Sequence, residues 1–375
     1  MDTISEVLHE MDDLLTRLIA ARRHPWRVIR EPEFQRPELV RFILTRVFHE
    51  RHRDPSLALD LAKVATDIVE TLPAIEVGGL RFQSWIYTAS LLRERARYGE
   101  AEEALAQAES ASHSAADPEV ALASIWLSRA LLCAEPDVWK PAEAEAWLDQ
   151  AETVSVTRGD AGRLVSIQTA RAFLLFRSGD LQGARQKFEA LLDATSITSR
   201  EAHLNALSNL MRVRVELGEA DHDVELEVQR LIDENDAIGQ VVPAAHARWM
   251  MGRVDMILGR YHHAVELFKR ASEEIDDADA SLRIGLDAAE ALLLDGRHSD
   301  GQRLAQDLAS AAVALDQREP SRRRALTAQV LAYLKAAAQR EAWTPDLVAD
   351  LGRYVDQITR QRPFDFIPPM PLADM

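Results

Sequence analysis

The segment from Arg248 to Ala271 constrains the fold of this chain more than any other part of the sequence. Gly252 and Ala264 lie on either side of Gly259, and Phe268 follows Ala264 by one helical turn. Small residues let two helices cross closely, a glycine suits the turn between them, and a large apolar side chain fills the space beside the crossing. The segment therefore predicts two antiparallel helices joined by a tight turn.

The same spacing recurs along most of the chain. If the turn residue is numbered 15, a small residue falls at position 20, a large or apolar one at 24, and another small or apolar one at 27. Unit by unit, these positions hold Ala58, Ala62 and Ala65; Ala101, Leu105 and Ala108; Ala144, Leu148 and Ala151; Ala184, Phe188 and Leu191; and Gly301, Ala305 and Leu308. The unit after Gly218 is weaker, because Asp221-His222-Asp223 replaces the small residue of its second helix.

This pattern resembles the tetratricopeptide repeat, whose strict period is 34 residues. The turn glycines at 179, 218, 259 and 296 are 39, 41 and 37 residues apart, so each unit has extra residues. Longer helices or loops would hold them, and residues 195–199, 238–243 and 276–279 have the composition of loops. The resemblance covers about residues 38–313 and implies about seven helix pairs. A generic α-solenoid without the family motif remains the alternative.

Composition agrees with an all-α fold, because Ala, Leu, Glu and Arg dominate and strand-like alternation is scarce. With 47% hydrophobic residues, the chain has ample material for a buried core. We expect a right-handed α-solenoid of antiparallel helix pairs, preceded by an N-terminal helix and closed by C-terminal capping helices.

The ends of the chain depart from the repeat. Residues 1–37 predict an N-terminal helix and a proline-containing connector, and residues 38–313 the repeat domain. Residues 320–362 predict capping helices. Four prolines in residues 363–375 prevent a helix there, although this tail contains Phe364 and Phe366, which are costly to leave in water. We therefore expect the tail to lie extended along a surface, either of this chain or of a partner.

Charge and cysteine content restrict the functional classes. A net charge of −17 opposes nucleic-acid binding, which needs a basic surface. No stretch approaches the ~20 apolar residues of a membrane span. Cys133 is the single cysteine, so no disulfide can form within the chain, which suits the cytoplasm. Its neighbours indicate a small hydrophobic core residue.

Signatures of catalysis, cofactors and metals are absent from the sequence. It contains no Gly-rich phosphate loop, no dinucleotide fingerprint and no nucleophile elbow, so we expect no enzyme and no cofactor. His49 and His52 are three residues apart, where a zinc protease helix needs four, and nothing supplies a third ligand. His262 and His263 are adjacent and cannot both point at one ion. We therefore expect no metal site.

Three charged runs have two interpretations each. Residues 219–236 contain eight carboxylates and one arginine, and residues 273–279 contain five carboxylates and no base. Both runs fit a solvated acidic face, or a binding surface for a basic partner or for the chain's own arginines. From Arg17 to Arg30 there are five arginines and no acid, which fits a solvated helix end or a docking patch.

In the family that the sequence resembles, the first helices of successive pairs line a concave groove that usually holds a peptide. Carrying positions 2, 5 and 9 of those helices over to this chain gives Thr169, Phe173, Asn205, Ser208, Arg212, His246, Trp249 and Arg253. Asn205 is able to hydrogen-bond a peptide backbone, and the lysine and asparagine clamp of chaperone-tail receptors is missing. Simple packing of Trp249 between helices is the alternative for that residue.

Two functional classes follow. The first is a non-enzymatic scaffold or adaptor that binds a protein or peptide in the groove. The second is a regulatory sensor whose helical repeats bind a small ligand or a signalling peptide. The sequence indicates neither the identity of the partner nor the oligomeric state.

Overall fold

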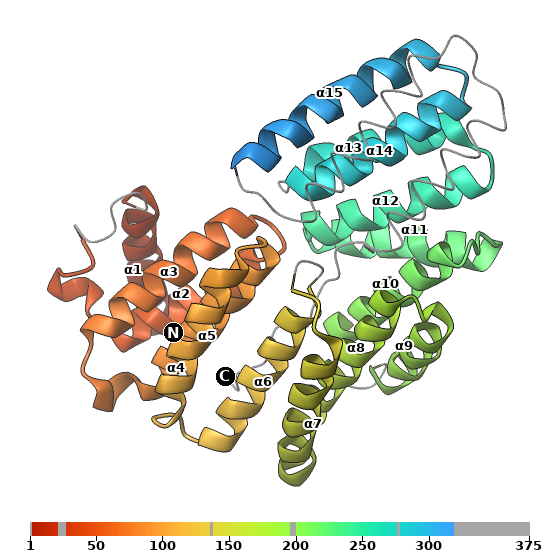
Figure 1. Ribbon diagram of the computed structural model, residues 1–375. Helices are drawn as coiled ribbons and strands as arrows, with labels where there is room; N and C mark the ends of the chain where they lie inside the picture. Colours follow the sequence, from red (N-terminus) through yellow and green to blue (C-terminus); the bar gives the residue numbers. More distant parts are fainter. Residues whose placement is uncertain (1, 22–27, 136–137, 196–199, 276–277, 319–375) are drawn as a thin grey trace. The chain divides into compact units, whose positions relative to one another are not determined.

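The computed structural model describes residues 2–21, 28–135, 138–195, 200–275 and 278–318 (Figure 1). Within this part the chain forms α-helices, one short 3-10 helix and turns. The helices run as follows: α1 Asp2–Ala20, η2 Pro32–Phe34, α2 Pro37–Glu50, α3 Pro55–Thr71, α4 Ala74–Glu94, α5 Tyr98–Ser112, α6 Pro118–Cys133, α7 Pro141–Arg158, α8 Ala161–Ser178, α9 Leu181–Thr195, α10 Arg200–Glu216, α11 His222–Ala237, α12 Val241–Ile257, α13 Tyr261–Glu274, α14 Ala278–Leu294 and α15 His298–Arg318.

The described residues divide into two compact units. Unit 1 extends from α1 to Ile167 in α8, apart from residues 134–139. Unit 2 comprises residues 134–139 and the chain from Gln168 to the end of α15. In each unit, helices that follow one another along the chain pack as pairs, and the first helix of a pair also contacts the first helix of the next, as α2 does with α4 and α10 with α12. The prediction of an all-α solenoid-type fold is confirmed within each unit.

The crossing of α12 and α13 shows why the pairs form. A Cβ atom added to Gly252 would overlap the ring of Phe268, which is fully buried. Gly259 turns the chain between the two helices with φ at +73°, a left-handed conformation that glycine adopts without strain. Ala264 is also fully buried at the crossing. The two small residues therefore set the distance between these helices, and the ring of Phe268 fills the remaining space.

Burial follows the frame read from the sequence. Positions 20 and 24 are buried in all six units in which we identified them, and position 27 is buried in five. The exception is Leu308 in α15, which is half-buried and lies against Gly285 of α14. The residues that identified the repeat are therefore the residues that pack the helices together.

Two details differ from the sequence-based expectation. In α11 the buried positions are Val224 and Val228, one residue later than the frame predicts, because Asp221 caps the helix through the amide of Val224 and delays its start. The loop expected at residues 238–243 is shorter, since α12 begins at Val241. Pro243 lies in its first turn, where a missing N–H group has little cost.

The N-terminal segment is part of unit 1 and packs there through α1 and η2. Met11, Leu14 and Leu18 of α1 are buried, as is Phe34 of η2. Arg17 forms ion pairs with Glu31 and Glu33, and its guanidinium lies 4.9 Å from the centre of the Phe34 ring. This arginine of the basic run thus binds acids of its own chain. The predicted capping helices and tail, residues 320–375, lie outside the described residues.

Adding one methyl group at Gly252 tests the close crossing of α12 and α13. Gly252→Ala should lower the free energy of unfolding by about 1–3 kcal/mol, because the new methyl group overlaps the buried Phe268 ring. Gly99→Ala is the control, since nothing lies within 4 Å of a Cβ atom added at that glycine in α5. It should leave stability unchanged or raise it by up to about 1 kcal/mol. Equal losses in chemical denaturation would contradict the proposed crossing.

Candidate functional site

One face of α10 is lined with polar side chains. Asn205, Ser208, Asn209, Arg212 and Glu216 recur at steps of three and four residues, so they form one stripe along the helix. Ser208, Asn209 and Arg212 are each less than a tenth exposed. Buried polar groups are unfavourable unless they find hydrogen-bond partners. A helix of an ordinary core would carry apolar residues at these positions, so this stripe is the candidate site.

Asn209 is the strongest sign of a ligand on this stripe. Its side chain is 3% exposed, and its amide nitrogen Nδ2 has no hydrogen-bond partner among the residues that the structure describes. The Nδ2 group carries two N–H donors, which can bind a carbonyl oxygen. Sequence reasoning missed Asn209, although it follows Asn205 by four residues and thus shares its face of the helix.

Helix α8 contributes Thr169 and Phe173 from the preceding pair, and both are buried. The guanidinium of Arg177, one turn further along α8, lies 4.4 Å from the centre of the Phe173 ring. Arg177 also donates a hydrogen bond of 3.3 Å to Glu135. The Phe173 ring is therefore covered by a paired cation.

Helix α12 places its three predicted residues close together. The His246 ring stacks on Trp249 with ring centroids 6.1 Å apart. Trp249 is 2% exposed, lies in a core cluster with Phe268 and other apolar residues, and donates a hydrogen bond of 2.6 Å from Nε1 to Asp287. Trp249 thus packs between helices, which is one of the two interpretations that the sequence left open. The hydrogen bond between Trp249 and Asp287 could not be predicted from the sequence.

Arg253 connects three neighbouring first helices. It pairs with Glu216 of α10, and its Nε atom lies 3.8 Å from a carboxylate oxygen of Asp287 in α14. Since Glu216 belongs to the α10 stripe, this ion-pair network closes one end of that stripe. The network therefore connects α10, α12 and α14 at that end of the stripe.

Unit 1 has an ion pair at the corresponding place. Arg51, just after α2, lies 2.5 Å from Glu94 of α4, which also contacts Arg93 at 3.4 Å. Burial alone would raise the pKa of the Glu94 carboxyl group, but the two arginines lower it below its ordinary value. The first helices of neighbouring pairs are therefore joined by mostly buried charges in both units.

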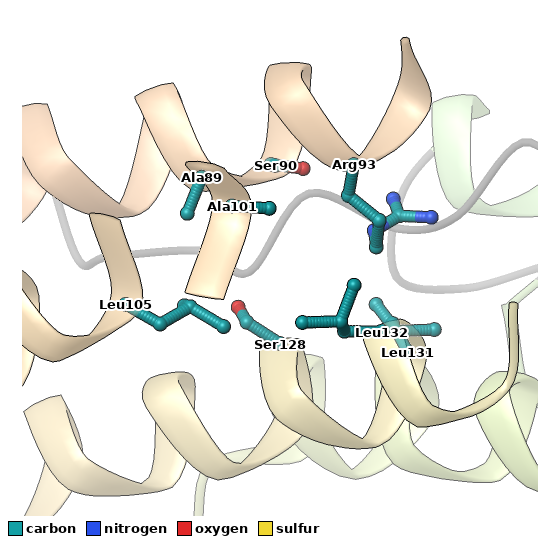
Figure 2. A pocket seen from close by; sticks show the side chains of 8 residues that line it. All are labelled: Ala89, Ser90, Arg93, Ala101, Leu105, Ser128, Leu131 and Leu132. Carbon is teal, nitrogen blue, oxygen red and sulfur yellow. The ribbon is translucent and has the colours of Figure 1, made fainter. Parts of the chain in front are cut away.

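A small pocket in unit 1 lies between α4, α5 and α6 (Figure 2). It is lined by Ala89, Ser90, Arg93, Ala101, Leu105, Ser128, Leu131 and Leu132. The enclosed space is only about 10 Å³, room for about one water molecule, whereas small-molecule sites typically measure ~300–1,000 Å³. Its hydroxyl groups are already engaged, because Ser90 bonds to Glu94 and Ser128 donates to the carbonyl oxygen of Ser124. We therefore base the candidate site on the α10 stripe.

The acidic run at residues 219–236 binds arginines of the same chain. Glu219 accepts hydrogen bonds of 2.7 Å from both Arg185 and Arg214. Glu225 pairs with Arg260 at 2.8 Å, which ties α11 to the turn before α13. These contacts connect successive helix pairs and favour the interpretation in which the acids serve the chain's own arginines.

The histidine pairs and the cysteine have structural environments. His263 contacts the buried carboxylate of Asp255 at 2.5 Å, whereas His262 lies 3.6 Å from Asp295. Within the described ranges, no three His, Cys, Asp or Glu side chains gather as a metal site requires. Cys133 is buried, and burial raises the pKa of its thiol group. None of the helices in the described ranges is long and apolar enough to cross a membrane.

Comparison with known proteins defines the fold more than the function. No protein-family model matches this chain, and no curated protein matches its sequence. Among solved structures, NprR in complex with its cognate peptide NprX matches with a TM-score of 0.54 and 14% identity, covering 86% of this chain and 89% of NprR. At that identity the match shows a shared fold, of the tetratricopeptide-like type.

Two further solved structures show weaker similarity. A Rap protein complexed with Competence and Sporulation Factor has a TM-score of 0.49 and 15% identity, covering 80% of this chain and 98% of the Rap chain. A STAND protein with a tetratricopeptide repeat sensor, PH0952 from Pyrococcus horikoshii, has a TM-score of 0.48 and 12% identity. That match covers 90% of this chain and 54% of the other.

A double-mutant cycle can measure the coupling energy between Glu216 and Arg253. Glu216→Gln and Arg253→Gln should each lower the free energy of unfolding by about 2 kcal/mol, because each leaves a charge without its partner in a mostly buried site. Their coupling energy should be about 1–3 kcal/mol. The exposed pair Asp300 and Arg303, one turn apart on α15, is the control and should show less than about 0.5 kcal/mol of coupling. Similar coupling in both pairs would contradict a structural role for the network.

Proposed function

We propose that this protein binds an extended peptide along the polar stripe of α10, beside the first helix of the next pair, α12. The observation that carries the proposal is the buried amide of Asn209, whose Nδ2 group has no partner among the described residues. A peptide backbone presents a carbonyl oxygen at every residue and can supply the missing acceptor. Ser208 and Arg212, on the same stripe, add a hydroxyl group and a cation.

The shared fold supports this proposal. NprR, which has the same type of fold over most of this chain, was solved in complex with its cognate peptide NprX. We propose that this chain acts likewise by binding and not by catalysis, since its sequence carries no catalytic signature. A cytoplasmic location, expected from the single cysteine, stays a prediction.

The second candidate, a sensor for a small ligand, has less support. The unit 1 pocket is smaller than the usual small-molecule site, and its serine hydroxyl groups are engaged within the chain. A sensor of a signalling peptide would use the same α10 stripe as a scaffold. The two roles then differ in the consequence of binding and not in the site.

Selection from a phage-displayed library of random linear dodecapeptides tests the proposal. The protein should enrich peptides that bind it in solution, and Asn209→Ala should weaken their binding by 10-fold or more, because the buried N–H donors are lost. Glu266→Ala, at an exposed position of α13, is the control and should leave the dissociation constant unchanged. Failure to enrich any peptide, or equal binding by the Asn209→Ala variant, would contradict the proposal.

A further inference from the structure

The stripe of α12 that carries His246 and Arg253 changes from polar to apolar near the end of the helix. On α12, Ile257 follows Arg253 by one turn, so it continues the stripe that begins at His246. Ile257 is 46% exposed, and Leu258 beside it is 44% exposed. Arg253 pairs with Glu216 at the end of the α10 stripe, so Ile257 lies about one turn beyond that end. Large apolar side chains this exposed, beyond the end of a row of hydrogen-bonding groups, fit an occupant that carries both polar and apolar groups.

We propose that residues 363–375 of this chain occupy this surface, which we define as the α10 stripe together with Ile257 and Leu258. The inference rests on the proposed function, because it uses the same backbone-binding stripe, and it adds the identity of one occupant. That occupant competes with any external peptide. The arguments come from the sequence of the tail and from the chemistry of the surface.

The first argument is conformational. Prolines at 363, 368, 369 and 371 exclude helix formation and favour an extended backbone. Proline lacks an N–H group, so much of such a segment offers carbonyl acceptors without matching donors. The stripe offers the complementary chemistry, since the Nδ2 group of Asn209 is a buried donor without a described acceptor.

The second argument is the order of side chains in the tail. Successive side chains of an extended segment point to opposite sides, so Phe364 and Phe366 share one side while Asp365 lies on the other. The surface has a matching part, because the exposed side chains of Ile257 and Leu258 offer apolar contact to the side that carries the two phenylalanines. In such a pose the two rings face the surface while Asp365 points to solvent.

The third argument is the covalent connection between the tail and the surface. The tail belongs to the same chain as the stripe, so its binding is intramolecular, and this linkage raises its effective concentration above that of a free peptide. A tail that binds the surface with modest intrinsic affinity then occupies it in most molecules. An external peptide has to displace the tail, and its apparent affinity falls by the occupied fraction.

The experiment uses the full-length chain and a fluorescein-labelled synthetic peptide of residues 363–375. The full-length variant Phe364→Ser/Phe366→Ser removes the aromatic groups of the internal tail without changing the body of the protein. The labelled peptide should bind this variant at least 10-fold more tightly than it binds the wild-type chain. Adding Asn209→Ala should abolish that gain, whereas Val156→Ser, at an exposed position of α7 in unit 1, should preserve it.

Equal affinity of the labelled peptide for the wild-type chain and the tail variant would overturn the inference, as would tight binding that is insensitive to Asn209→Ala. Library-selected peptides test the proposed function separately. If they bind through Asn209 while the tail peptide does not bind the tail variant, only the tail inference fails. If neither binds through Asn209, both proposals fail.

Discussion

The close crossing of the two helices within each pair is the constraint on which the rest of the structure depends. Gly252 allows the ring of Phe268 to lie directly against the backbone of α12, and Ala264 keeps α13 equally close. Because an isolated pair cannot bury its apolar face, pairs stack, and their first helices then come to lie beside one another. That arrangement aligns the stripes of α10, α12 and α14, so side chains distant in sequence form one surface.

Charge reinforces this packing. Arg253 bridges Glu216 and Asp287 across three first helices, while Glu219 and Glu225 bind arginines across the second helices. A chain with a net charge of −17 can thus place carboxylates inside its helix stack without leaving them unpaired. The polar stripe of α10 differs from these networks, because the Nδ2 group of Asn209 at its centre has no hydrogen-bond partner in the described part of the chain.

The sequence was sufficient to predict the helix pairs, since residues such as Gly252 and Phe268 serve in packing and packing has a fixed period. It did not predict the register of α11, because a cap at Asp221 depends on local backbone geometry that the period does not encode. Three of the eight predicted site residues, Asn205, Ser208 and Arg212, lie on the stripe. Asn209 was missed because only positions 2, 5 and 9 were carried over from the resembled family. The burial of Trp249 depends on Asp287, which is 38 residues away in the sequence.

The most direct test of the account is photo-cross-linking of a bound peptide. Library-selected dodecapeptides carrying one photoreactive residue would be irradiated on the full-length protein, digested, and mapped by mass spectrometry. The account predicts cross-links to α10 around Asn205 to Arg212 and to the inner stripes of α8 and α12, with yields that fall in the Asn209→Ala variant. Cross-links that map instead to the second helices α9, α11 and α13, with no effect of Asn209→Ala, would contradict it.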